Sequence, residues 1–103
     1  VQARTANVHT RRSKGVDFSL KDPDTGRVGG VTMLDCPQNP RYPVPWFVIN
    51  DPPGYGFLEA GFLYNEPYIL EPKSALTLRY GIVIHPGRYG PGDIKKEWNR
   101  FYK

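Results

Sequence analysis

The residues best suited to chemistry gather in the segment Asp35–Trp46, which reads DCPQNPRYPVPW. Four prolines fall within nine residues, and polar and aromatic residues separate them. Proline fixes φ and removes a backbone donor, so neither a helix nor a central strand can run through the proline-rich part. The sequence therefore predicts a stiff extended loop, which either displays a binding site or braces two strands.

Ligand binding at this loop would need hydrogen-bonding groups beside flat apolar surfaces. The side chains that could supply these groups are Asp35, Asn39, Arg41, Tyr42 and Trp46. Asn39 and Arg41 would donate hydrogen bonds, and Trp46 or Tyr42 would offer a stacking face. This combination favours a carbohydrate or a related polar ligand. The alternative is that the rings fill a β core and that Arg41 pairs with Asp35 in a purely structural loop.

Acid–base chemistry has two candidates in the sequence, His85 and Glu66. Histidine titrates near neutrality when unperturbed, which suits a general acid or base. Asp35 and Glu66 could also form the carboxylate pair that glycoside hydrolysis uses. A structural imidazole at the turn before Gly87 is the alternative interpretation of His85. Whether the chain is an enzyme therefore stays open.

Metal, thiol and phosphate chemistry have little support in the sequence. No pair of histidines or other ligand residues has a recognised metal-binding spacing, so we expect no metal and no cofactor. Cys36 has no local base and no helix N-terminus to activate it, which favours a small apolar spacer. As the one cysteine in the chain, it also excludes an internal disulfide.

The composition is that of one domain of 103 residues, with 39% hydrophobic and 23% charged residues. The net charge of +4 comes from residues 1–14, which hold four basic residues and no acidic one. A basic arm that binds nucleic acid is one interpretation of this segment, but a solvated strand or tail is favoured. We therefore divide the chain into an arm, 1–14, and a β domain, 15–103. No apolar run is long enough to span a membrane.

Five segments have the apolar patterns of β-strands, with glycine and proline between them. They are residues 15–20, 27–34, 46–49, 67–70 and 75–85. The turn at 21–26 joins the first two as a hairpin, and Gly29–Gly30 predicts a bulge or a close backbone approach. In the last segment, a strict period of two predicts a buried face formed by Leu76, Leu78, Tyr80, Ile82 and Ile84.

A helical pattern occurs at the C-terminus. Gly92–Asp93 predicts an N-cap, and Ile94, Trp98 and Phe101 fall on one face. A helix of about ten residues is marginal alone, so we expect it to dock on the sheet. The predicted fold is mainly β, an antiparallel β-sandwich with one short C-terminal helix.

The segment Asp35–Trp46 resembles the DHPxNPRHPxPW signature of a bacterial family catalogued as methane oxygenase PmoA-like. Residues 56–67 and 76–87 are similar to two further blocks of that family, and the resemblance covers roughly residues 15–102. It implies a β-sandwich of secreted or periplasmic type associated with sugar breakdown. Cys36, Tyr42 and, less clearly, Asn65 stand where histidine often occurs, whereas His85 is kept. If those histidines carry chemistry in the family, this chain has lost it.

The leading hypothesis is a β-sandwich that binds a carbohydrate or related polar ligand through the loop 35–46. The first alternative is a structural or assembly domain without a ligand, and the second is an oxygenase, as the family label states. Exposed strand edges would allow pairing with a second copy or with a partner chain. The sequence begins at Val1, and we expect that a larger protein continued upstream.

Overall fold

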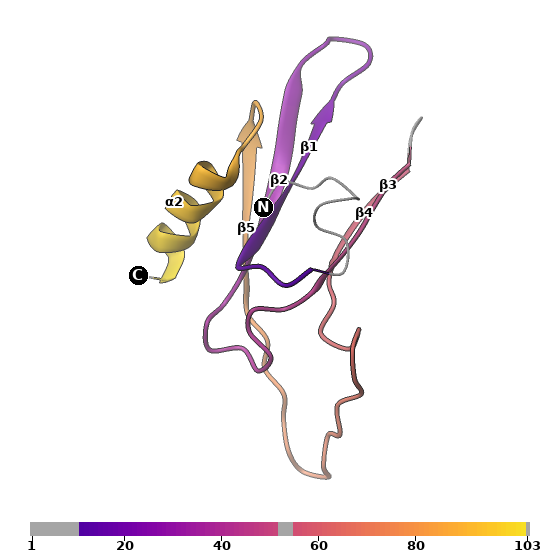
Figure 1. Ribbon diagram of the computed structural model, residues 1–103, viewed down its shortest axis with the longest axis vertical. Coiled ribbons are helices and arrows are strands. Elements are labelled where there is room, and N and C mark those ends of the chain that lie inside the picture. The colour runs from indigo at the N-terminus through magenta and orange to yellow at the C-terminus, as the bar shows by residue number, and fades with distance from the viewer. Residues whose placement is uncertain (1–10, 52–54, 103) are drawn as a thin grey trace.

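The chain folds into two antiparallel β-sheets and one helix, in a computed structural model that describes residues 11–51 and 55–102. The first sheet has three strands, β1 (Gly15–Lys21), β2 (Val28–Asp35) and β5 (Tyr80–Pro86), in the order β1-β2-β5. Strands β3 (Trp46–Asp51) and β4 (Tyr55–Ala60) pair as a separate hairpin. Figure 1 shows the three-stranded sheet between this hairpin and the helix α2 (Pro91–Tyr102). The mainly β fold with packed antiparallel sheets and a short C-terminal helix confirms the predicted class.

The register of the first sheet decides which residues share a face. Phe18 pairs with Val31, which pairs with Ile84, so these three side chains lie in one row across the sheet. The neighbouring residues Ser19, Gly30 and His85 form a row on the opposite face. The turn between β1 and β2 closes where Gly26 takes a φ of 74°, a conformation that glycine adopts without a steric penalty.

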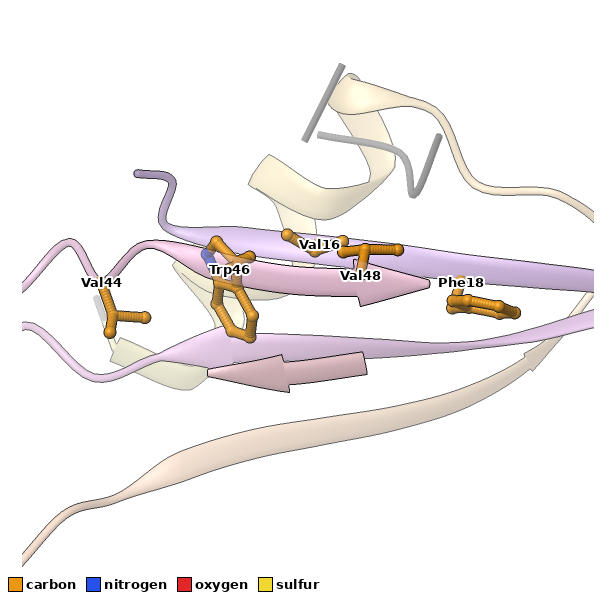
Figure 2. Close-up of a cluster of buried hydrophobic side chains, with 5 residues drawn as sticks. All are labelled: Val16, Phe18, Val44, Trp46 and Val48. Carbon is orange, nitrogen blue, oxygen red and sulfur yellow. The ribbon is translucent and has the colours of Figure 1, made fainter. Parts of the chain in front are cut away.

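The hydrophobic core lies between β1 and the β3–β4 hairpin. It is formed by Val16, Phe18, Val44, Trp46 and Val48, and Figure 2 shows these side chains between the two layers. Gly56 of β4 belongs to this contact, because a Cβ there would lie 2.7 Å from the ring of Phe18. The hairpin therefore approaches the sheet closely over β1.

Helix α2 packs against β1 and β5 on the face of the sheet opposite the hairpin. Pro91 opens it, as is common at the first helical position, and Asp93 accepts a hydrogen bond of 2.9 Å from the backbone N–H of Gly90. The helix thus begins slightly before the predicted cap. Ile94 is buried against the sheet, whereas Phe101 is exposed in part although it lies over Gly81.

Two predicted strands differ in the structure. Residues 67–70 and 75–79 are not strands, and β5 begins only at Tyr80. Both segments carry the residue types of a strand, but neither forms a ladder with another described segment. Of the predicted arm 1–14, residues 1–10 lie outside the described residues. Arg12 forms an isolated antiparallel bridge with Pro45.

Part of the face predicted to be buried along the last strand is exposed. Ile82 and Ile84 are among the most exposed large apolar side chains of the described chain. The residues that flank this pair have the opposite environment, because Gly81 and His85 are buried. The alternation was predicted correctly, and Leu76, Leu78 and Tyr80 are half-buried as its inward face. At Ile82 and Ile84 the predicted direction was wrong, because the hairpin does not extend over β5.

Candidate functional site

Two polar side chains of the proline-rich loop, Asp35 and Asn39, form hydrogen bonds inside the protein. Asp35 is fully buried, and its carboxylate accepts hydrogen bonds from the side-chain amide of Asn39 at 2.7 Å and from the backbone N–H of Val44 at 2.9 Å. Asn39 also bonds both the N–H and the carbonyl of Arg79, at 2.9 Å and 2.7 Å. Burial raises the pKa of Asp35, and the hydrogen bond from Asn39 opposes that rise. This half of the loop is a brace.

Arg41 holds a second loop in place. Its guanidinium donates hydrogen bonds of 2.7 Å to the carbonyls of Phe62, Glu66 and Pro67. It also lies over the ring of Phe62 at 4.7 Å. The structural alternative predicted that Arg41 pairs with Asp35, and these contacts show that it does not. It fixes the backbone of residues 62–67 instead, and three of its donors are used in doing so.

The two aromatic candidates of the loop are engaged with other parts of the chain. Trp46 is buried in the core and donates its indole N–H to the carbonyl of Ser13 at 2.8 Å. Tyr42 stacks on Trp98 of α2, with ring centroids 6.3 Å apart. Its buried hydroxyl has no hydrogen-bond partner among the described residues. Burial raises the pKa of this phenol, and the charge of Asp35 adds to the rise. Neither ring is an open stacking platform.

His85 forms a buried pair with Asp17 on the helix side of the sheet. Its Nε2 lies 2.5 Å from Oδ1 of Asp17, and both side chains are almost fully buried. Thr32 donates to the same oxygen at 2.7 Å, and Ser19 donates to the other. Tyr89 stacks on the imidazole in parallel at 3.5 Å. The contact is an ion pair when His85 is protonated, and the surrounding groups leave no open side for a substrate to approach.

Sequence reasoning missed Asp17, although one signal pointed to the place. The glycine pair at 29–30 predicted a bulge or a close approach, and the register is continuous, so there is no bulge. A Cβ at Gly30 would lie 2.9 Å from the imidazole of His85, so the close approach is what the structure contains. Glu66 is exposed in the loop that Arg41 holds, and no ion pair or hydrogen bond joins it to His85 in the described ranges.

The β3–β4 hairpin covers only part of the face of the sheet on which it packs. Across one row, the exposed fraction rises from 8% at Phe18 to 37% at Val31 and 83% at Ile84. The next row repeats the trend, from buried Val16 through half-buried Met33 to exposed Ile82. We call Val31, Ile82 and Ile84 the uncovered face.

An apolar groove of about 440 Å³ lies where the chain enters β5. It is lined by Glu59, Ala60, Phe62, Leu63, Tyr68, Leu70, Leu76 and Leu78. One wall comes from the end of β4, and another from the extended chain that leads into β5. Since Leu76 and Leu78 precede Ile82 and Ile84 with the same period of two, the groove and the uncovered face belong to one apolar stretch of chain.

Strand edges border this surface. Strand β4 has a hydrogen-bonded neighbour on one side only, β3, and β5 has only β2, among the described strands. In Figure 2, β4 is the strand of the hairpin that lies toward β5. No backbone hydrogen bond fixes Tyr68–Leu70 or Ala75–Leu78 to another described segment. The surface therefore combines apolar side chains with free backbone donors and acceptors.

The fold and this surface define a small antiparallel β-sandwich domain with one incompletely covered sheet. A family model described as a family of unknown function (DUF6807) matches residues 1–99, and the chain belongs to that family. No curated protein and no solved structure matched the chain. The family description does not mention an oxygenase, so the resemblance to PmoA-like proteins stays a prediction.

None of the helices in the described ranges has the length and apolar character needed to cross a membrane. No group of three or more histidine, cysteine, aspartate or glutamate side chains is arranged to hold a metal ion in the described part of the chain.

Proposed function

We propose that this domain is an assembly module, which accepts a β-strand of another polypeptide beside β4 and over β5. The observation that carries the proposal is the rise in exposure across the sheet, from buried Phe18 to exposed Ile84. A strand that presents a strictly alternating apolar face to water is unusual, because a half-buried strand normally turns that face inward. The simplest physical reason is that a further strand covers it.

The position of β4 explains how such a strand would be held. Layers of a β-sandwich lie about 10 Å apart, and neighbouring strands within a layer lie about 4.8 Å apart. A strand paired with the free edge of β4 would extend the hairpin layer toward β5. Its backbone would bond to β4, and its inward side chains would contact Ile82 and Ile84. This is strand addition, in which backbone hydrogen bonds give affinity and alternate side chains give specificity.

The apolar character of the groove supports a polypeptide over a sugar. Four leucines line it, and Glu59 and Tyr68 are its polar members. Sugar sites combine an aromatic platform with several hydrogen-bonding groups, and the proline-rich loop has its own such groups engaged elsewhere. The same surface suits an extended peptide whose alternate residues are aliphatic.

The test uses a labelled seven-residue peptide in which valine alternates with threonine. We expect it to bind the domain, as measured by fluorescence anisotropy. A peptide of the same composition with its valines contiguous should bind at least tenfold more weakly. Ile84→Lys should also weaken binding tenfold or more, because it places a charge on the covered surface.

Leu20→Lys is the matched control. Leu20 is also exposed and aliphatic, and its strand β1 is at the opposite edge of the sheet from β5. This variant should bind the peptide as the wild type does. Equal binding by the Ile84 and Leu20 variants, or by the two peptides, would overturn the proposal, provided that circular dichroism gives unchanged spectra.

A second candidate function is carbohydrate binding on the loop that Arg41 holds. Tyr64 and Tyr68 are exposed on this loop, and Asn65 and Glu66 are exposed between them. The three bonds from Arg41 hold the loop in one shape, which lowers the entropy cost of binding. In this second proposal, the sugar would bind the loop that Arg41 holds and not the proline-rich loop.

A glycan array distinguishes this second candidate. Retention of a glycan by the wild type that is lost in Tyr64→Ala would support it. Phe101→Ala removes an exposed ring on α2 and serves as the control. Loss of retention in both variants, or no retention by the wild type, would count against a sugar site on this loop.

A further inference from the structure

The edge that we assign to an incoming strand carries one charged side chain. Glu59 lies on β4, is exposed, and supplies the one carboxylate among the residues that line the groove. No ion pair within the described ranges includes it. It stands next to last in the strand and is followed by Ala60, which packs against the core.

This position gives Glu59 a cross-strand neighbour as soon as a strand is added. In a sheet, side chains on adjacent strands lie about 5 Å apart, and opposite charges at such sites attract while like charges repel. On its other side, Glu59 pairs with Phe47 of β3, which offers no charge. The carboxylate is therefore free to interact with the incoming strand.

We propose that Glu59 selects a partner strand with lysine or arginine opposite it. The inference rests on the proposed function, because it names the chemistry of the strand that the β4 edge would accept. A second copy of this chain is disfavoured in a register that sets Glu59 opposite its own counterpart, because like charges on neighbouring strands repel. The partner is then an amphipathic strand of a different polypeptide, apolar on its inward positions and basic at one outward position.

The test compares two labelled peptides on the wild type and on Glu59→Lys. Both are seven residues long with valine at alternate positions, and their outward residues are threonine except for one central lysine or glutamate. The wild type should bind the lysine peptide about threefold to fivefold more tightly than the glutamate peptide at low salt. Glu59→Lys should reverse the preference, and Glu59→Gln should remove it. The preference should shrink as salt is added.

The outcomes separate the two proposals. If both peptides bind the wild type and Glu59→Lys equally, the role of Glu59 is wrong while strand addition stands. If neither peptide binds either protein, strand addition itself fails and this inference fails with it. Sedimentation of the protein without peptide gives a third result. A stable wild-type dimer that is lost in Glu59→Lys or in Ile84→Lys would identify a second copy of this chain as the occupant. That result would overturn the proposal of a basic partner strand.

Discussion

The two faces of the sheet β1-β2-β5 differ at β5, where polar groups are buried on one face and apolar side chains are exposed on the other. Toward the helix, the sheet buries the Asp17–His85 pair and Thr32, and half-buried Ser19 donates to the same carboxylate. Toward the hairpin, the same strand exposes Ile82 and Ile84. The buried polar groups have hydrogen-bond partners inside the protein, whereas the exposed apolar side chains have no packing partner over them among the described residues. We call the first the complete face, because its polar groups are paired within the described residues, and the second the incomplete face, because it leaves Ile82 and Ile84 exposed.

The largest expected effect comes from breaking the complete face. Asp17→Ala leaves His85 buried without its carboxylate and leaves two hydroxyl donors without an acceptor. Removing one partner of a buried pair costs about 3–5 kcal/mol, so urea unfolding should show a loss of that order. Asp24→Ala, in the exposed turn, should change stability by about 0.5 kcal/mol or less. Similar losses in the two variants would mean that the Asp17 network contributes little.

A smaller effect is expected from closing the space beside His85. In Gly30→Ala, the new Cβ would lie 2.8 Å from the carbonyl of Phe18 and 2.9 Å from the imidazole. Overpacking of this kind typically costs about 1–3 kcal/mol. Gly92→Ala is the control, because nothing lies within 4 Å of its Cβ and alanine favours a helix. Thermal unfolding should separate the two, and a Gly30→Ala protein as stable as the wild type would contradict the close approach.

Asp35 sharpens the comparison, because its buried carboxyl has amide donors but no ion-pair partner among the described residues. Its pKa in the folded state is raised by burial above the ordinary value of 3.8. Between that value and the raised pKa, the folded state binds more protons than the unfolded state, so stability falls as pH rises through this window. The slope for one proton is at most about 1.4 kcal/mol per pH unit. Urea unfolding of the wild type and Asp35→Asn over pH measures it, and an opposite slope in their difference would refute the assignment.

The smallest effect is expected on the incomplete face. Ile84→Thr keeps a β-branched residue in the strand and removes apolar area that is already exposed. Its unfolding free energy should stay within about 0.5 kcal/mol of the wild type. Val16→Thr makes a similar change at a fully buried core position and should cost about 1–3 kcal/mol. Equal losses at the two sites would mean that Ile84 is already covered.

The local elements of the fold could be predicted from the sequence, because their signals are local. Alternation identified β1, and the turn chemistry at 21–26 indicated that β2 follows it as the second strand of a hairpin. Periodicity identified α2 near Ile94. Periodicity also grouped Ile82 with Ile84, but it cannot say which face a second layer covers. That depends on where the β3–β4 hairpin comes to lie, which is a property of the whole chain.

The candidate site was harder to predict, because its decisive contacts are distant in sequence. Asn39 bonds to Arg79, 40 residues away, and Arg41 reaches carbonyls 21 to 26 residues away. The polar side chains of the proline-rich loop therefore turn inward, although their types suit a ligand equally well. Composition indicates what a side chain can bond to, and tertiary contacts decide which partner it has.

The contact between His85 and Asp17 has a consequence for the order in which the chain folds. The two residues are 68 positions apart, whereas β1 and β2 are joined by a short turn. Closing a long loop costs more entropy than closing a short one, so the β1–β2 hairpin should form first and β5 should add later. Until then, the carboxylate of Asp17 is hydrated. The three-stranded sheet is therefore complete only when His85 pairs with Asp17. The NMR resonances of the His85 imidazole are a probe of that last folding step.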